Sequence, residues 1–249
     1  SGTDALPLGT TSVTNNSTAP TDSALSFQTS TLNGVVANRI NAITSADLNH
    51  DGIVDLVVSN VASAAGSVTS LLGNGSGGFT AAAAGPTPTP PAPNSITVND
   101  FNRDGNPDLV VANQGDYEGL SVLLGDGSGA FFAAPYTVST GGGVSTGTPP
   151  TTQPPKPRIV VSADFNGDTY ADIAWTIDYR NTIHGNIGIA LNNGINTIDS
   201  FNDPFNGASP QFIQTGINPY GLIATDVNQD GAIDLISADS PSTGTGTIS

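Results

Sequence analysis

The chain contains four copies of one nine-residue pattern, Asp-x-Asn-x-Asp-Gly-x-x-Asp. The copies read DLNHDGIVD at residues 47–55, DFNRDGNPD at 100–108, DFNGDTYAD at 164–172 and DVNQDGAID at 226–234. Each copy brings three carboxylates and an amide oxygen into one short loop, where they repel one another unless a cation lies among them. Their starting positions, 47, 100, 164 and 226, are 53, 64 and 62 residues apart. This spacing predicts that a structural unit is repeated along with the loop.

The ligand atoms indicate calcium. Carboxylate, amide and carbonyl oxygens are hard ligands, and Ca²⁺ takes six to eight of them, whereas Mg²⁺ keeps several waters and Zn²⁺ prefers Cys and His. The sequence therefore predicts up to four calcium ions, with the ninth residue of each pattern closing the loop. The expected ligands are Asp47, Asn49, Asp51, the Ile53 carbonyl and Asp55; Asp100, Asn102, Asp104, the Asn106 carbonyl and Asp108; Asp164, Asn166, Asp168, the Tyr170 carbonyl and Asp172; Asp226, Asn228, Asp230, the Ala232 carbonyl and Asp234.

These loops do not have the features of helical EF-hands, which place a bidentate Glu at loop position 12. Position 12 is occupied here by Val58, Val111, Trp175 and Ser237, and each loop is followed by a strand-like run. The third loop differs from the others because Thr169 replaces the glycine that permits a sharp turn. We therefore expect the third loop to bind calcium more weakly than the other three.

The composition of the chain limits the kinds of molecule that it can bind. The formal net charge is −16, and the patterns hold three acidic residues in each of four copies, 12 of the 21 in the chain. Four calcium ions would add +8 and leave −8, so much of the acidity is metal-site charge. Five Lys and Arg residues give no basic surface for nucleic acid, and no apolar run is long enough to insert into a membrane. Because weak calcium loops fill at extracellular calcium concentrations, a secreted or cell-surface location is expected.

Short β-branched runs separated by Gly, Pro, Ser, Thr and Asn predict an all-β fold. One strand enters each loop and a second leaves it, and a third precedes Gly-rich hairpins such as GNGSGG and GDGSGA. A fourth short strand is expected to begin near Phe79, Phe131 and Phe201, and these residues and Trp175 are expected in the core. Four antiparallel strands per unit, repeated radially, predict the blades of a β-propeller.

The calcium loop and the following LLGNGSGGF-type hairpin resemble the FG-GAP or VCBS repeat family, whose blades form the head of integrin α-subunits. The resemblance covers about residues 27–239 and implies a propeller with calcium loops. It does not imply one function, because the family includes adhesins, lectins and accessory domains of enzymes. The sequence departs from the family at Thr169 and in the third hairpin, and it shows four repeats where the family usually closes with seven blades.

The four repeats are expected at about residues 29–80, 81–132, 133–202 and 203–249, within one propeller region at 29–249. Residues 1–28 are expected to supply outer strands of an incomplete blade. They could complete the fourth blade of the same chain or a blade of a neighbouring subunit, or the chain could belong to a longer propeller. Pairing of these strands would avoid an exposed sheet edge.

Function is expected on the face opposite the calcium loops, where the longer and more variable connections lie. Tyr117, Tyr179, Arg180 and His184 are the candidate residues there for a protein or glycan ligand. The leading hypothesis is a non-catalytic, calcium-stabilised extracellular propeller for adhesion or ligand binding. The alternatives are a structural subunit of an extracellular filament that self-assembles by strand exchange, a carbohydrate-binding lectin, and an accessory domain of an enzyme. Catalysis by this chain is not expected, because it has no Cys and its carboxylates cluster in the metal loops.

Overall fold

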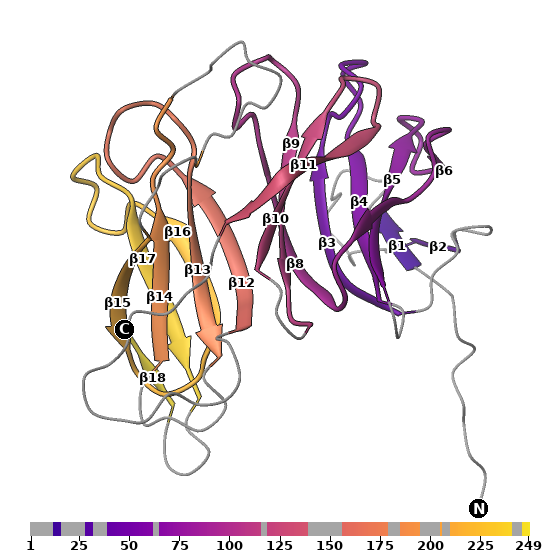
Figure 1. The fold of residues 1–249 in the computed structure, drawn as a ribbon. Coiled ribbons are helices and arrows are strands. Elements are labelled where there is room, and N and C mark those ends of the chain that lie inside the picture. The colour runs from indigo at the N-terminus through magenta and orange to yellow at the C-terminus, as the bar shows by residue number, and fades with distance from the viewer. Residues whose placement is uncertain are drawn as a thin grey trace, which may run out of the picture.

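The computed structural model describes residues 12–15, 28–31, 39–61, 65–115, 119–138, 156–178, 185–194, 205, 210–240 and 246–249. Every regular element in these segments is a β-strand, and most of the strands form four antiparallel sheets that are the blades of a propeller. The expected all-β fold is therefore confirmed (Figure 1).

Each blade is a meander whose strands pair in chain order. The first blade contains β3 (Ile40–Ala46), β4 (Asp55–Val61), β5 (Gly66–Gly73) and β6 (Phe79–Ala81), and β7 (Thr87–Thr89) also pairs with β5. The second contains β8 (Pro93–Asn99), β9 (Asp108–Asn113), β10 (Leu120–Gly125) and β11 (Phe131–Val138). The third contains β12 (Lys156–Ala163), β13 (Asp172–Asp178), β14 (Gly185–Ala190) and β15 (Gln211–Thr215). The fourth contains β16 (Pro219–Thr225), β17 (Asp234–Asp239) and β18 (Thr247–Ile248).

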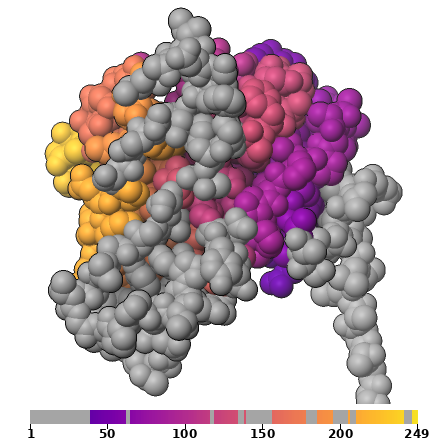
Figure 2. Space-filling model, viewed as in Figure 1, coloured from indigo at the N-terminus to yellow at the C-terminus, as the bar shows by residue number. Residues whose placement is uncertain are grey.

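Consecutive blades pack face to face. The innermost strands form a series in which β3 contacts β8, β8 contacts β12, and β12 contacts β16. In the space-filling view the blades form one continuous body, from the indigo first blade to the yellow fourth blade (Figure 2). Because both faces of an inner blade are covered, the central strands β9 and β10 are buried along their whole length.

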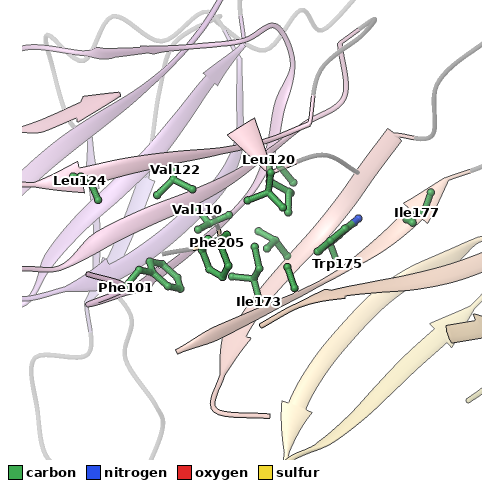
Figure 3. Packing of buried hydrophobic residues seen from close by; sticks show 13 residues of the cluster. Phe101, Val110, Leu120, Val122, Leu124, Ile173, Trp175, Ile177 and Phe205 are labelled. Carbon is green, nitrogen blue, oxygen red and sulfur yellow. The ribbon is translucent and has the colours of Figure 1, made fainter. Parts of the chain in front are cut away.

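The largest apolar cluster lies between the second and third blades (Figure 3). Trp175 is fully buried in it and meets the ring of Phe212 edge-on, with centroids 6.4 Å apart, which confirms the expectation that Trp175 belongs to the core. Its indole lies on Gly188 of the neighbouring strand, where an added Cβ would come within 2.4 Å of the ring. Gly188 thus makes room for the one tryptophan of the chain.

Of the three phenylalanines expected at the start of a fourth strand, two begin such a strand in the structure. Phe79 and Phe131 begin β6 and β11; Phe131 is buried and Phe79 is partly buried. Phe201 lies outside the described residues, and the fourth strand of the third blade is β15, later in the sequence than expected. That strand falls within residues 203–249, yet it pairs with β14, so the third blade extends beyond the boundary that the sequence suggested.

The two N-terminal strands, β1 (Ser12–Asn15) and β2 (Gln28–Thr31), pair with each other in a separate two-stranded sheet. In the fourth blade, the strand that pairs with the outer side of β17 is β18. The idea that residues 1–28 supply outer strands of an incomplete blade stays a prediction.

Candidate metal-binding loops

All four acidic loops occupy the same place in their blades, the connection between the first and second strands. They join β3 to β4, β8 to β9, β12 to β13 and β16 to β17. In the antiparallel register, the residue just before each loop pairs with the Asp that ends it, for example Ala46 with Asp55. The pairing of the two strands thus holds both ends of the loop together.

The first loop shows how the acidic side chains organise the turn. Asp47 accepts hydrogen bonds from the backbone N–H groups of Asp51 (3.2 Å) and Gly52 (2.9 Å). The Asn49 side-chain oxygen accepts a bond from the Asp51 N–H, and Asp51 accepts one from the Ile53 N–H. The same bonds recur in the loops that start at Asp100, Asp164 and Asp226. The sequence repeat therefore encodes one loop geometry four times.

The ninth residue connects the loop to the rest of the blade. Asp55 is fully buried and accepts bonds from the Leu48 N–H (2.9 Å) and the Gly73 N–H (2.7 Å) at the end of the third strand. Asp108 and Asp172 are equally buried and accept the equivalent pairs of bonds. In the fourth loop, Asp234 is only partly buried, and the bond that its carboxylate accepts among the described residues comes from the Val227 N–H.

Burial makes two of these carboxylates, Asp108 and Asp172, costly to ionise. Desolvation, with a smaller contribution from the nearby Asp104 carboxylate, raises the pKa of Asp108 to about 7. Burial also raises the pKa of Asp172, and repulsion from Asp168 and Asp164 adds to it. A cation within the loop would offset both the desolvation and the repulsion.

Thr169 takes up the conformation of the glycine that it replaces. Its φ is +73°, close to the +79° of Gly52 and within the left-handed region of Gly105 and Gly231 at the same position. The loop therefore keeps its shape, and the residue itself bears the conformational cost. The third loop keeps the four turn-forming hydrogen bonds of the other loops, and the Gly167 N–H donates one more to Asp164 (2.7 Å). Weaker calcium binding by this loop stays a prediction.

Side chains at the fourth loop position link neighbouring loops. The His50 ring nitrogen Nε2 lies 3.1 Å from the side-chain oxygen of Asn106 in the second loop. Arg103 donates from its Nη2 to both the hydroxyl and the carbonyl oxygen of Thr169, and its guanidinium lies 3.7 Å above the Tyr170 ring centroid. These contacts join residues 56 and 66 positions apart and have no signal in a single repeat.

The donor chemistry of the loops fits a hard cation, because each holds three carboxylates, an Asn oxygen and a backbone carbonyl from Ile53, Asn106, Tyr170 or Ala232. In the structure, the carboxylate oxygens face backbone N–H groups. Within the described segments, no three acidic or imidazole groups stand together as a metal-binding group. The calcium assignment accordingly stays a prediction.

The residues expected to bind a ligand on the opposite face, Tyr117, Tyr179, Arg180 and His184, all lie outside the described residues. The same is true of a G-x-S-x-G pattern at residues 143–147, which in α/β-hydrolases marks a strand-to-helix turn. The described part of the chain contains no helix that could form such a turn. It likewise has no helix long and apolar enough to cross a lipid bilayer.

Radially repeated antiparallel blades, each with an acidic loop between its first two strands, define a repeat propeller. The profile of the FG-GAP-like repeat matches residues 47–111 and 100–175, which together span residues 47–175, or just over half of the 249-residue chain. The chain therefore belongs to the FG-GAP repeat family. A search of curated proteins found no match. Propellers of this family generally bind rather than catalyse, and their repeats are typically extracellular.

Proposed function

We propose that this chain is a non-catalytic, calcium-stabilised extracellular propeller that serves in adhesion or ligand binding. The observation that carries the calcium part is the burial of the ninth-position carboxylates of the first three loops, which raises the pKa of Asp108 and Asp172. Calcium bound in the loops would stabilise the ionised form of these carboxylates and hold the third strand in register through them. The loops are therefore structural supports in this proposal, and ligand binding belongs to the opposite face.

The first test is a calcium titration of the whole chain by calorimetry, together with thermal unfolding in calcium and in excess EDTA. Calcium that binds only the folded state stabilises it by RT ln(1 + [Ca²⁺]/Kd), about 2.7 kcal/mol per site at 100 times Kd. We expect a higher melting temperature in calcium and a stoichiometry of up to four. An equal melting temperature in the two conditions would rule out calcium stabilisation.

A matched pair of variants separates metal binding from turn capping. Asp51→Asn changes a predicted ligand that also caps the Ile53 N–H. Asp126→Asn changes an exposed aspartate that caps the Ser128 N–H in a hairpin outside the loops. We expect the first variant to lose one calcium site and part of the calcium-induced rise in melting temperature, and the second to keep both. Equal losses in the two variants would show that the aspartates only cap turns.

The ligand part of the proposal is tested on the opposite face. A glycan array and a binding screen against extracellular proteins, each in calcium, would distinguish a lectin from a protein-binding adhesin. Tyr179→Ala and Arg180→Ala should abolish the interaction, while Asp126→Ala should not. Retention of full binding by both of the first two variants would place the ligand site elsewhere.

A further inference from the structure

The innermost strands of the second, third and fourth blades each contain a β-bulge at the same place. The pairing register skips Asn94 in β8 and Tyr220 in β16, and it shifts by one residue between Pro157 and Val160 in β12, where Arg158 lies. Asn94, Arg158 and Tyr220 are each six residues before the acidic loop of their blade. A bulge re-aims a side chain out of the regular alternation of a strand. The repeat thus presents three different side chains at one position of three blades.

The sequence encodes these bulges. Each of the three residues follows a proline, which is Pro93, Pro157 or Pro219. Because proline has no N–H to donate to a neighbouring strand, it occurs within sheets at edges and bulges. The irregularity is therefore a consequence of the sequence at this position in all three blades.

The three bulge residues contact one another across the blades. The side-chain amide of Asn94 donates a hydrogen bond to the Arg158 carbonyl (2.9 Å), from the second blade to the third. The Arg158 guanidinium lies 3.6 Å above the centroid of the Tyr220 ring, from the third blade to the fourth. Together they form a row, here called the bulge row: Asn94, Arg158 and Tyr220.

The bulge row is supported by direct contacts between the strands that carry it. The Val160 N–H donates to the Ser95 hydroxyl (3.2 Å), and the hydroxyls of Thr97 and Ser162 are 2.8 Å apart. These bonds join β8 to β12 beyond the Asn94 contact, and β12 in turn packs on β16 (Figure 1). A site on packed strands holds its side chains more precisely than a site on loops.

The bulge row lies at the end of the blades away from the acidic loops. The loops follow the last residues of β8, β12 and β16, whereas the bulges lie near the first residues of these strands. Tyr220 is 48% exposed and stacks on Arg158 of the preceding blade, so its ring reaches solvent at the junction of the third and fourth blades. The row is therefore on the face where the proposed function places the ligand.

The chemistry of the bulge row suits a carboxylate attached to a flat, polar ring. A guanidinium that stacks through its flat face has its N–H groups in the plane of the stack, and their fork matches the two oxygens of a carboxylate. Lys156 begins the same strand, so two of the five Lys and Arg residues of this acidic chain lie within three residues of one another. The carboxylate of Asp239, the residue that pairs with Pro219, already accepts bonds from the Ser237 and Ser249 hydroxyls.

We propose that the bulge row binds a carboxylate-bearing sugar, with Arg158 on the carboxylate, the Tyr220 ring beside the sugar ring and the Asn94 amide as a further polar contact. This inference rests on the part of the proposed function that places a ligand opposite the calcium loops, and it names the chemical class of that ligand. It also assigns the ligand to residues on the blades themselves.

The test measures binding of trigalacturonate to the full chain in millimolar calcium by calorimetry. The fully methyl-esterified trisaccharide is the matched probe, because it keeps the sugar rings and loses the carboxylate charges. Arg158→Gln removes the charge and the fork, Arg158→Lys keeps the charge and loses the fork, and Tyr220→Ala removes the ring. Arg39→Gln, at an exposed arginine just before β3, removes the same charge outside the row and serves as the control. Melting temperatures in calcium establish that each variant is folded.

We expect the unchanged chain and Arg39→Gln to bind trigalacturonate and to bind its ester at least tenfold more weakly. Arg158→Gln, Arg158→Lys and Tyr220→Ala should each weaken trigalacturonate binding about tenfold or more while the response of the melting temperature to calcium stays the same. Equal binding of acid and ester, no binding of the acid by the unchanged chain, or unchanged binding by a folded Arg158→Gln chain would overturn the proposal. Tighter binding of a short oligo-aspartate peptide than of trigalacturonate would also overturn it, because the row would then recognise protein.

This result is distinguishable from failure of the proposed function. A ligand found by the glycan array or protein screen that is lost in Tyr179→Ala and retained in Arg158→Gln would leave the proposed function standing and show that the bulge row is not the site. Absence of a calcium effect on the melting temperature would reject the calcium part alone, since none of the bulge-row residues is a predicted calcium ligand.

Discussion

Replacing Thr169 with glycine tests how the third loop tolerates a residue in left-handed conformation. Two effects oppose each other. Glycine removes a conformational cost of about 1–2 kcal/mol, because Thr169 has a φ of +73°. It also removes the hydroxyl that accepts a hydrogen bond from Arg103, and a bond to a charged group contributes about 1.5–3 kcal/mol when buried and less when exposed, as here. We therefore expect Thr169→Gly alone to change the free energy of unfolding by less than about 1 kcal/mol.

The balance should change when Arg103 is replaced. In an Arg103→Gln background the hydroxyl has lost its partner, so Thr169→Gly should stabilise the protein by about 1–2 kcal/mol. Gln at position 103 has the same left-handed cost as Arg, whose φ is +57°, so the comparison isolates the side-chain contact. Arg103→Lys is the matched control, because it keeps the charge and loses the planar fork that stacks on Tyr170.

The assay is urea unfolding of the four proteins of this double-mutant cycle in saturating calcium, followed by circular dichroism. The coupling free energy between positions 103 and 169 should be about 0.5–1.5 kcal/mol. A coupling of zero, with Thr169→Gly equally stabilising in both backgrounds, would refute the idea that Arg103 supports Thr169. Calcium titration of the same variants would show whether the third site is weakened by the Thr169 backbone, as its sequence predicts.

Two further outcomes follow from the packing and the buried carboxylates. Gly188→Ala should destabilise the protein by about 1–3 kcal/mol, because the added Cβ would overlap the Trp175 ring. The control is Gly221→Ala, whose Cβ would meet one other Cβ at 3.3 Å and should change the free energy of unfolding little. Urea unfolding measures both variants. In calcium-free buffer, the folded protein holds the Asp108 proton more tightly than the unfolded chain, so its melting temperature should fall as the pH rises from about 4 to about 7, and a flat profile would contradict this.

The acidic loops could be predicted from the sequence because each is formed by residues that are close together in the chain. The hydrogen bonds within the loop join residues at most seven positions apart, so the nine-residue pattern contains the information for the turn. The burial of Trp175 was predictable from its alignment with Val58 and Val111, which are also buried. Periodicity and alignment between repeats thus recover the blade and its central strands.

Contacts between blades were not predictable in the same way. Arg103 and Thr169 are 66 residues apart. Both lie within the nine-residue pattern, but each occupies a position where its own loop differs from the others, so the repeat does not predict their contact. The fourth strand of the third blade was misplaced because that blade lacks the glycine hairpin that marks the strand elsewhere, and β15 begins only at Gln211. The Pro-rich segment provided β7, whose Pro88 is accommodated on the outside of the sheet, where a missing N–H is tolerated.

The ninth-position carboxylate ties together the two properties that the sequence predicted separately, a metal loop and a blade. Asp55 is a predicted ligand, and it is also the residue that accepts the Gly73 N–H and so anchors the end of β5. Asp108 and Asp172 make the same link to Gly125 and Asn192. Whatever charge occupies the loop therefore acts on the third strand through one buried side chain. In the first three blades, loss of a cation would loosen the ends of β5, β10 and β14 through this side chain.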